Sequence, residues 1–214
     1  MDLWTHLAQH PADNAVFNAA MTGLSALETT AVVAAYDFAG IDTLVDVAGG
    51  HGALIAAILT AHPPMQGILI DLPHVVVAAA TPLQAAGIAA RCRIVAGDMF
   101  VSVPEGGDAY ILESILHDWD DGRAVAILRT CRAAMPAHAK LVLVEHVLAP
   151  GNTPDSGRVQ DLNMLVVLGG CERTAAEFKA LLAAVGFVLG YRTFCTSAEA
   201  PDAVPPRRSG AGPP

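Results

Sequence analysis

Runs of apolar residues alternate with amphipathic stretches over most of the chain. Largely apolar runs of strand length occupy five segments, namely residues 43–48, 67–71, 93–96, 109–112 and 141–147. Apolar residues recur at helical spacing in the segments between or after them, namely residues 53–61, 73–86, 120–135 and 159–168. Apolar strands separated by helices are typical of a parallel sheet that is covered on both faces. We therefore predict an α/β fold, a doubly wound Rossmann-like sheet with helices on both faces.

Residues 1–24 precede this alternation. They carry apolar side chains at helical spacing but are too few to form a core of their own. Such helices either dock on the main domain or are the remnant and linker of a larger N-terminal domain, and we prefer the second interpretation. Ser25 and Glu28 then form a capping-box pattern, which predicts the start of a new helix.

The C-terminal part has its own helix signal and then loses its pattern. Thr174 and Glu177 form a second capping box, and a last strand is expected over residues 186–194. Residues 198–214 are rich in proline and have almost no large apolar side chain, so we interpret them as a disordered tail. The main domain is therefore expected to span residues 25–197.

Composition excludes some kinds of binding partner and indicates a cellular compartment. The chain has 12 basic and 21 acidic residues and a formal charge of −9, so it lacks the basic footprint of a nucleic-acid-binding protein. No apolar run approaches the roughly 18 residues of a membrane span, and the first residues do not resemble a signal peptide. The four cysteines are far apart, which fits reduced thiols rather than a metal or redox motif. We expect a cytoplasmic protein that has no nucleic-acid or membrane partner.

Candidate ligand-binding residues follow three of the predicted strands. Asp46 is followed by a glycine turn, and glycines there let a ligand approach the backbone closely, near the free N–H groups of the next helix. Asp71 ends the second strand, where a carboxylate can accept hydrogen bonds from both hydroxyls of a ribose. Asp98 and Met99 follow the third strand and suit an adenine. Because ligands of open α/β sheets bind at the carboxyl ends of the strands, these residues together predict a nucleoside site.

A nicotinamide cofactor is the rival ligand for this site. Its G-x-G-x-x-G fingerprint needs a small residue at position 55, where this chain has Ile55. Asp46 inside the first strand also argues against it. An NAD-dependent oxidoreductase is therefore the less favoured alternative.

His117 follows the fourth strand and is a candidate general base. A histidine at the carboxyl end of a strand, beside the predicted nucleoside, is well placed to remove a proton. Glu145, after the fifth strand, and Glu172 are the carboxylates that could hold its other ring nitrogen, as in a catalytic triad.

A cluster of aspartates surrounds His117 in the sequence. Asp118, Asp120 and Asp121 have side chains that can bind a divalent cation. The same residues suit the first turn of a helix, where carboxylates interact favourably with the helix dipole. We favour the helix start and expect no metal.

Several of these segments, taken in order, resemble the catalytic domain of class I S-adenosylmethionine-dependent O-methyltransferases, of the plant caffeic-acid type and the bacterial polyketide-tailoring type. The segments that carry the resemblance are residues 45–52, 71–75, 97–100, 116–119, 161–165 and 169–174. The resemblance implies that this domain transfers a methyl group from S-adenosylmethionine to a hydroxyl of a small aromatic or polyketide-like acceptor.

The resemblance also implies a role for each candidate residue. Those implied to bind S-adenosylmethionine are Ala48, Gly49, Gly50, Asp71, Asp98 and Met99. His117 would be the general base, with Glu145 and Glu172 on either side of its imidazole. Those implied to line or cover the acceptor site are Asn163, Met164, Phe17 and Met21.

The chain departs from the family at several points. Ala48 stands where glycine is usual and would crowd the cofactor, and Glu113 stands where a basic or otherwise compatible residue is common and would weaken its binding. Most of the N-terminal domain that forms the homodimer in the family is missing, so we doubt a homodimer here. The last antiparallel strand of the family sheet also has no convincing counterpart after residue 194. An impaired fragment that acts as a binding module is therefore a second alternative to an active enzyme.

Overall fold

The computed structural model describes residues 3–151 and 155–190, and its centre is a sheet of five strands in the order β3-β2-β1-β4-β5. The strands are β1 (Thr43–Val47), β2 (Gln66–Asp71), β3 (Cys92–Ala96), β4 (Ala109–Glu113) and β5 (Lys140–Val144). Every neighbouring pair in this sheet is parallel. The predicted α/β class and parallel sheet are therefore confirmed, and the carboxyl ends of all five strands lie along one edge.

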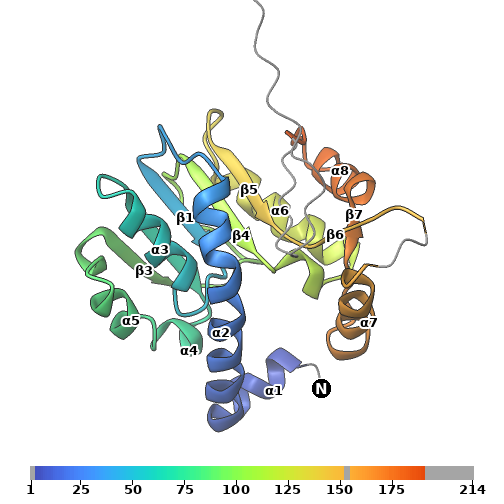
Figure 1. Ribbon diagram of the computed structural model, residues 1–214, viewed down its shortest axis with the longest axis horizontal. Coiled ribbons are helices and arrows are strands. Elements are labelled where there is room, and N and C mark those ends of the chain that lie inside the picture. Colours follow the sequence, from blue (N-terminus) through green and yellow to red (C-terminus); the bar gives the residue numbers. More distant parts are fainter. Residues whose placement is uncertain (1–2, 152–154, 191–214) are drawn as a thin grey trace, which may run out of the picture.

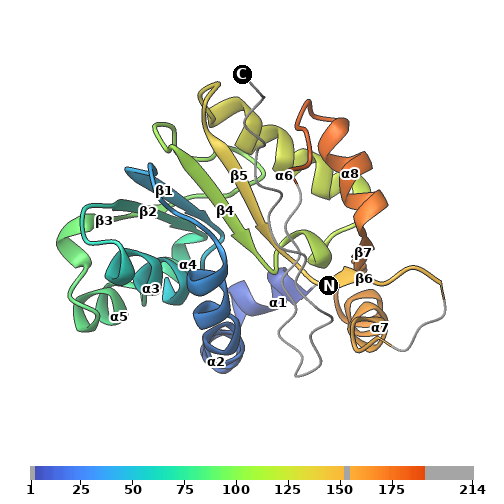
Figure 2. The ribbon, with the colours of Figure 1, turned by 45° about the horizontal axis from the view of Figure 1, so that its top comes forward.

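Helices cover both faces of the sheet (Figures 1 and 2). One face packs against α2 (Pro11–Ala35), α3 (Ala53–Ala61) and α5 (Ala80–Ala85), and the other against α6 (Asp121–Ala134) and α8 (Ala175–Ala183). Leu44 and Ile111 belong to the first core, and Val45 and Tyr110 to the second. This alternation along β1 and β4 is the period-two pattern of strands that are buried on both sides.

The N-terminal helices differ from the sequence expectation. After α1 (Leu3–Gln9), a single helix, α2, runs through the position where Ser25 was expected to begin a new one. That prediction is wrong because residues before Ser25 are equally compatible with a helix, so no free N–H groups remain there for Ser25 to cap. The Ser25 hydroxyl instead donates a hydrogen bond of 2.6 Å to Oε2 of Glu113.

Two further elements differ between sequence and structure. The helix expected over residues 73–86 is divided into α4 (Pro73–Val76) and α5. Pro82 explains the break, since a proline without an N–H group is tolerated only in the first turn of a helix, where α5 has it. The strand expected to run from residue 186 is absent over residues 186–190, and residues 191–194 lie outside the described part of the chain.

The C-terminal part of the described chain forms a small lobe beside β5 (Figure 1). It contains α7 (Gly157–Val167) and a two-stranded parallel pairing of β6 (Val147–Leu148) with β7 (Arg173–Thr174). The second capping box is confirmed: the Thr174 side chain accepts from the Glu177 N–H, and the Glu177 carboxylate accepts from the Thr174 N–H. The β6–β7 pairing therefore brings Glu172, which precedes β7, close to Glu145, which lies shortly before β6.

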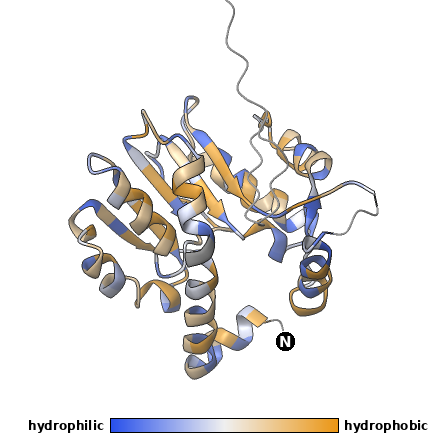
Figure 3. Cartoon of the chain, in the orientation of Figure 1, coloured by the Kyte–Doolittle hydropathy of each residue, from blue (hydrophilic) through white to orange (hydrophobic). Residues whose placement is uncertain are grey.

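Large apolar side chains are exposed on α2 and α7. The strands of the central sheet are largely hydrophobic (Figure 3) and their side chains form the buried cores. The exposed ones on these helices are Val16, Met21, Leu24, Val159, Leu162, Leu165, Val166 and Val167. Among the described helices none is long and apolar enough by itself to cross a membrane. Only the two arms of the bent α2, Pro11–Ser25 and Glu28–Ala35, meet the length and composition criteria when they are taken together.

Candidate active site

The residues at the strand ends follow one another along the carboxyl edge of the sheet in the spatial order β3, β2, β1, β4. Asp98 follows β3, Asp71 ends β2, the glycine turn follows β1, and Glu113 ends β4. The β1–β4 pairing joins Asp46 to Ile111, and its continuation puts Glu113 level with Ala48. The edge therefore presents carboxylates on both sides of the glycine turn.

The turn after β1 packs closely against Asp46 on one side and has open space on the other. A Cβ atom on Gly49 would lie 2.3 Å from Oδ2 of Asp46, which is 1% exposed, so only glycine fits at this position. Gly50 has a positive φ of 59° and no neighbouring atom within 4 Å of a Cβ on its open side. Gly52, with a φ of 80°, is the N-cap of α3. Free N–H groups at the start of α3 and an open backbone make the turn a suitable seat for a polar ligand group.

Two residues beside the turn have a backbone conformation that is unusual for their type. Ala48 has a φ of 58° and Ser114 a φ of 54°, and these are the only non-glycine residues with positive φ in the described chain. Both follow the end of a central strand, at β1 and at β4. Strained residues that gather at one edge of a sheet are a common property of functional sites.

The two carboxylates expected to bind the nucleoside are held by backbone N–H groups. Asp71 accepts hydrogen bonds from the N–H groups of Gly50 (2.8 Å) and Leu72 (2.6 Å), and Asp98 accepts one from Phe100 (2.8 Å). Burial raises the pKa of Asp71, while its backbone hydrogen bonds act in the opposite direction. A carboxylate oxygen can accept more than one hydrogen bond, so both side chains can still bind hydroxyl or amine donors.

Two more acids are buried next to the turn without enough partners. Oδ2 of Asp46 and Oε1 of Glu113 are both buried and have no hydrogen-bond donor. Burial raises the pKa of Asp46 well above its usual value, and the charges of Glu113 and Asp71 add to the effect. Burial also raises the pKa of Glu113 to about 7. Unpartnered buried carboxylate oxygens are costly, and this cost favours the neutral, protonated form of both side chains.

Both predicted glutamates lie on the Nδ1 side of His117, and not on either side of its imidazole as expected. Its Nδ1 is 2.8 Å from Oε1 of Glu172 and 3.9 Å from Oε2 of Glu145. The side chain of Glu172 is fully buried and that of Glu145 is 2% exposed, while His117 is 12% exposed. Glu145 also accepts the backbone N–H groups of Ile115 (3.0 Å) and Leu116 (2.7 Å), which fixes the loop that carries His117.

These carboxylates change the basicity of the imidazole. Burial by itself lowers the pKa of His117, but the hydrogen bond to Glu172 and the charges of Glu145 and Asp118 outweigh it and raise the pKa to about 9. A carboxylate on Nδ1 fixes the tautomer and leaves Nε2 as the atom that can exchange a proton with a ligand. Oδ1 of Asp118 lies 3.3 Å from Nε2.

The loop with His117 is tied to the small lobe by residues that the sequence reasoning missed. Arg173 is 1% exposed and donates to the carbonyl oxygens of Leu116 (2.8 Å) and Trp119 (2.7 Å). Asp161 accepts the backbone N–H of Glu172 (2.9 Å). Arg173 follows Glu172 directly in the sequence, but nothing in the pattern of apolar positions distinguishes a buried arginine from an exposed one.

The aspartates after His117 have structural partners. Asp120 is the N-cap of α6 and accepts the backbone N–H of Arg123 (2.9 Å), and Asp121 forms an ion pair with Arg173 (3.0 Å). The helix-start interpretation is confirmed for both. A group that could hold a metal ion is formed instead by His117, Glu145 and Glu172, whose ligand atoms lie within 4.8 Å of one another. The same three residues therefore suit either a base with two carboxylates or a cation site.

The residues that were expected to line or cover the acceptor site differ in their burial and in their contacts. Phe17 packs edge-on against Trp4 (5.7 Å between ring centroids), and Trp4 stacks on Trp119 (6.0 Å), so α1 and α2 reach the His117 loop. Met21 is 41% exposed. On α7, Asn163 is exposed and Met164 is buried. The Trp4–Trp119 stacking was not predicted, although both tryptophans were visible in the sequence.

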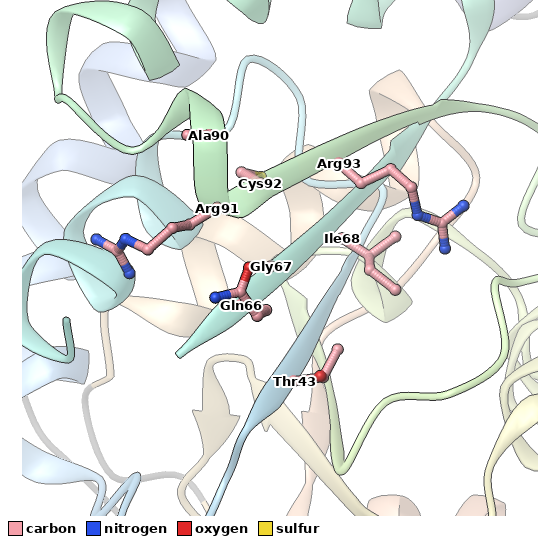
Figure 4. Close-up of a pocket in the computed structure, with 8 residues that line it drawn as sticks. All are labelled: Thr43, Gln66, Gly67, Ile68, Ala90, Arg91, Cys92 and Arg93. Carbon is pink, nitrogen blue, oxygen red and sulfur yellow. The ribbon is translucent and has the colours of Figure 1, made fainter. Parts of the chain in front are cut away.

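A shallow hollow elsewhere on the sheet is separate from this site (Figure 4). It lies around the amino-terminal ends of β1, β2 and β3, and Arg91 and Arg93 point away from each other at its sides. Arg91 donates to the carbonyl oxygens of Leu59 and Met65, so its charge is engaged within the fold. The chemistry-bearing residues are at the opposite ends of these strands.

Comparison with known proteins shows the family of this chain. The chain matches the model of the O-methyltransferase domain family over residues 1–188, and it belongs to that family. It is 53% identical over 184 residues to the phenazine O-methyltransferase PhzM of Lysobacter antibioticus, covering 86% of this chain and 54% of that protein.

Solved structures show the same architecture. The crystal structure of LaPhzM has 51% sequence identity and a TM-score of 0.86, over 89% of this chain and 57% of that one. NcsB1 from neocarzinostatin biosynthesis, solved in complex with S-adenosyl-L-homocysteine and 1,4-dihydroxy-2-naphthoic acid, has 36% identity and a TM-score of 0.81, over 87% of this chain and 56% of that one. The chain spans about half the length of the curated relatives it matches.

Proposed function

We propose that this chain forms the catalytic part of an O-methyltransferase that uses S-adenosylmethionine and methylates a hydroxyl of a small aromatic acceptor. The observation that carries the proposal is the position of His117, held by Glu172 at 2.8 Å, on the same sheet edge as the glycine turn and Asp71. Membership of the O-methyltransferase domain family supports it.

The residues at the sheet edge fit the cofactor. Asp98 and Met99 suit the adenine, Asp71 suits the ribose, and the open side of Gly50 leaves room for the rest of the molecule. Related structures contain this cofactor or its product, as in NcsB1 with S-adenosylmethionine and 2-hydroxy-5-methyl naphthoic acid.

The cofactor supplies a methyl group that the positive charge on sulfur already makes electrophilic. The work of the protein is to align the acceptor oxygen with that methyl group and to take up the hydroxyl proton. In our proposal Nε2 of His117 accepts the proton as the new oxygen–carbon bond forms and the carbon–sulfur bond breaks. Glu172 and Glu145 stabilise the resulting imidazolium.

Small aromatic hydroxyl compounds are the acceptor class that we propose. A phenol has a pKa near 10, as the tyrosine side chain does, so a positioned base with a pKa of about 9 matches it closely. The relatives named above act on a phenazine or were solved with a naphthoic acid. Trp4, Phe17 and Trp119 are aromatic side chains near the His117 loop that suit a flat ring.

The proposal is tested by calorimetric titration of the chain with S-adenosylmethionine, S-adenosylhomocysteine and NAD, followed by turnover with a panel of phenols and hydroxynaphthoates. We expect binding of the first two ligands, no binding of NAD, and methylation of at least one acceptor. Binding of NAD alone would point to an oxidoreductase. Binding of S-adenosylmethionine without turnover of any acceptor would favour a binding module.

A further inference from the structure

The short helix α1 is joined to α2 through a single residue that is not helical, and the two helices run in different directions (Figures 1 and 2). That residue is His10, with φ −125° and ψ 82°. Pro11 explains the break, because its ring disfavours a helical conformation in the residue before it. A change of the dihedral angles at His10 alone therefore moves α1 relative to α2.

Few contacts hold α1 in its position. It has seven residues, a length at which an isolated helix is not stable in water, and Leu7 is the one buried side chain along Leu3–Gln9. Across the junction with α2, Nε2 of His6 lies 2.7 Å from Oδ2 of Asp13. This contact is exposed to solvent and contributes little to stability. The position of α1 therefore depends strongly on its remaining contact, which is made by Trp4.

Trp4 links α2 to the loop that carries His117. Its ring stacks on Trp119, with 6.0 Å between ring centroids and an interplanar angle of 27°, and it meets Phe17 of α2 edge-on at 5.7 Å. Trp119 comes two residues after the candidate base, and Phe17 is one of the residues expected to line the acceptor site. Trp4 therefore bridges the two parts of the chain between which the acceptor is expected to bind.

Trp119 is enclosed in this arrangement without a hydrogen bond for its indole. Its Nε1 is buried and has no partner among the described residues. The side chains of Trp4, Phe100 and Arg123 lie against its ring, and none of them offers a hydrogen-bond acceptor. A buried donor without an acceptor costs free energy, so the closed arrangement is less stable than a fully paired one.

We propose that α1 is a cover of the active site, which opens about His10 to admit the acceptor and closes by stacking Trp4 on Trp119. Trp4 is a positioning residue that keeps the aromatic acceptor next to His117. This inference rests on the proposed function, because it needs an acceptor at that histidine. A site that opens for exchange of ligands and closes for reaction is a common requirement of enzymes that must exclude water.

Steady-state kinetics with variants of α1 test the role of Trp4. Trp4→Ala should raise the KM of the acceptor by about tenfold, because an aromatic contact is lost, with a much smaller effect on kcat. Its affinity for S-adenosylhomocysteine, measured by calorimetry, should not change, which also shows that the variant is folded. Trp4→Phe keeps an aromatic ring and should retain most of the acceptor affinity. Gln9→Ala, at an exposed position of the same helix, should change neither ligand's affinity.

Tryptophan fluorescence tests the movement of α1. Trp4 and Trp119 are the only two tryptophans in the sequence, so Trp119→Phe leaves a single tryptophan, on α1, and keeps an aromatic ring opposite it. Acrylamide should quench the fluorescence of Trp4 in this variant without ligands. Addition of S-adenosylhomocysteine together with an acceptor should lower the quenching constant at least about twofold, since the cover closes. S-adenosylhomocysteine alone should have little effect.

The outcomes separate this inference from the proposed function. An unchanged acceptor KM in Trp4→Ala, or equal losses of affinity for the acceptor and for S-adenosylhomocysteine, would overturn the role of Trp4 while leaving the methyltransferase proposal intact. Quenching of Trp4 that does not respond to the acceptor would overturn the movement of α1, even if Trp4→Ala does not fold. If the unmodified chain binds neither S-adenosylmethionine nor S-adenosylhomocysteine, the proposed function itself fails, and this inference fails with it.

Discussion

Nδ1 of His117 lies 2.8 Å from Oε1 of Glu172, a carboxylate that is fully buried and comes from 55 residues further along the chain. This contact, together with Glu145, raises the pKa of His117 to about 9 against the opposing effect of burial. A general base must be neutral to act, so we expect methyl transfer to increase with pH between 7 and 9.

Glu172→Gln should move that pH dependence. Without the negative charge the pKa of His117 falls, so the rising part of the kcat/KM profile should shift to lower pH by about one unit. The maximum rate should also fall, since a weaker base removes the proton less effectively. Glu105→Gln removes the same charge at an exposed position, so it should leave the pH profile of kcat/KM unchanged. A Glu172→Gln profile identical to that of the unmodified chain would contradict the role of this contact.

Metal removal distinguishes the two possible uses of the His117 cluster. The ligand atoms of His117, Glu145 and Glu172 are close enough to hold a cation, but the proposed chemistry needs none. Treatment with EDTA and passage over a desalting column should therefore leave the rate of methyl transfer unchanged. Loss of activity that is restored by adding Mg²⁺ or Zn²⁺ would show that the cluster is a metal site.

Arg173 is expected to stabilise both the fold and the site. It is 1% exposed and bonds to carbonyl oxygens of the His117 loop and to Asp121. Arg173→Met removes these donors and leaves buried carbonyl groups unpaired, so we expect a loss of about 3 kcal/mol in the free energy of unfolding. Denaturant unfolding measures this loss. Arg132→Met, at an arginine whose bond to the Met135 carbonyl oxygen is 3.3 Å long, should cost much less.

Ala48→Gly should stabilise the chain. Ala48 has a φ of 58°, a left-handed conformation that costs an L-residue roughly 1 kcal/mol and costs glycine almost nothing. The free energy of unfolding should therefore rise by up to about 1 kcal/mol, and thermal unfolding would detect it. Ala149→Gly, at a position with ordinary backbone geometry outside regular secondary structure, should not stabilise. A fall in stability on Ala48→Gly would mean that the alanine methyl contributes packing that outweighs its strain.

Most of the sheet could be predicted from the sequence because its strands are apolar on both faces. The period of apolar positions located β1 to β5 to within a few residues, and the capping box at Thr174 located α8. The cap pattern at Ser25 did not mark a helix start because the residues before it are also compatible with a helix, and its hydroxyl bonds to a distant strand instead. Its partner Glu113 lies 88 positions away in the sequence.

Site residues that directly follow a strand could be predicted from the sequence. Those whose position depends on contacts with other elements could not. Asp71, Asp98 and His117 could be placed because the carboxyl ends of parallel strands share one edge. The pairing of Glu172 with His117 was a hypothesis from residue type, and the structure brings the two side chains together. Arg173 and Trp4 were missed because their partners come from other elements, which no periodicity in a single sequence reveals.

The role of His117 as general base is tested by a single-turnover measurement of His117→Ala with S-adenosylmethionine and an acceptor that the unmodified chain methylates. We expect the variant to bind S-adenosylhomocysteine as tightly as the unmodified chain but to transfer the methyl group at least about a hundredfold more slowly, the usual contribution of a general base. Methyl transfer at an unchanged rate would contradict the assignment of His117 as the base.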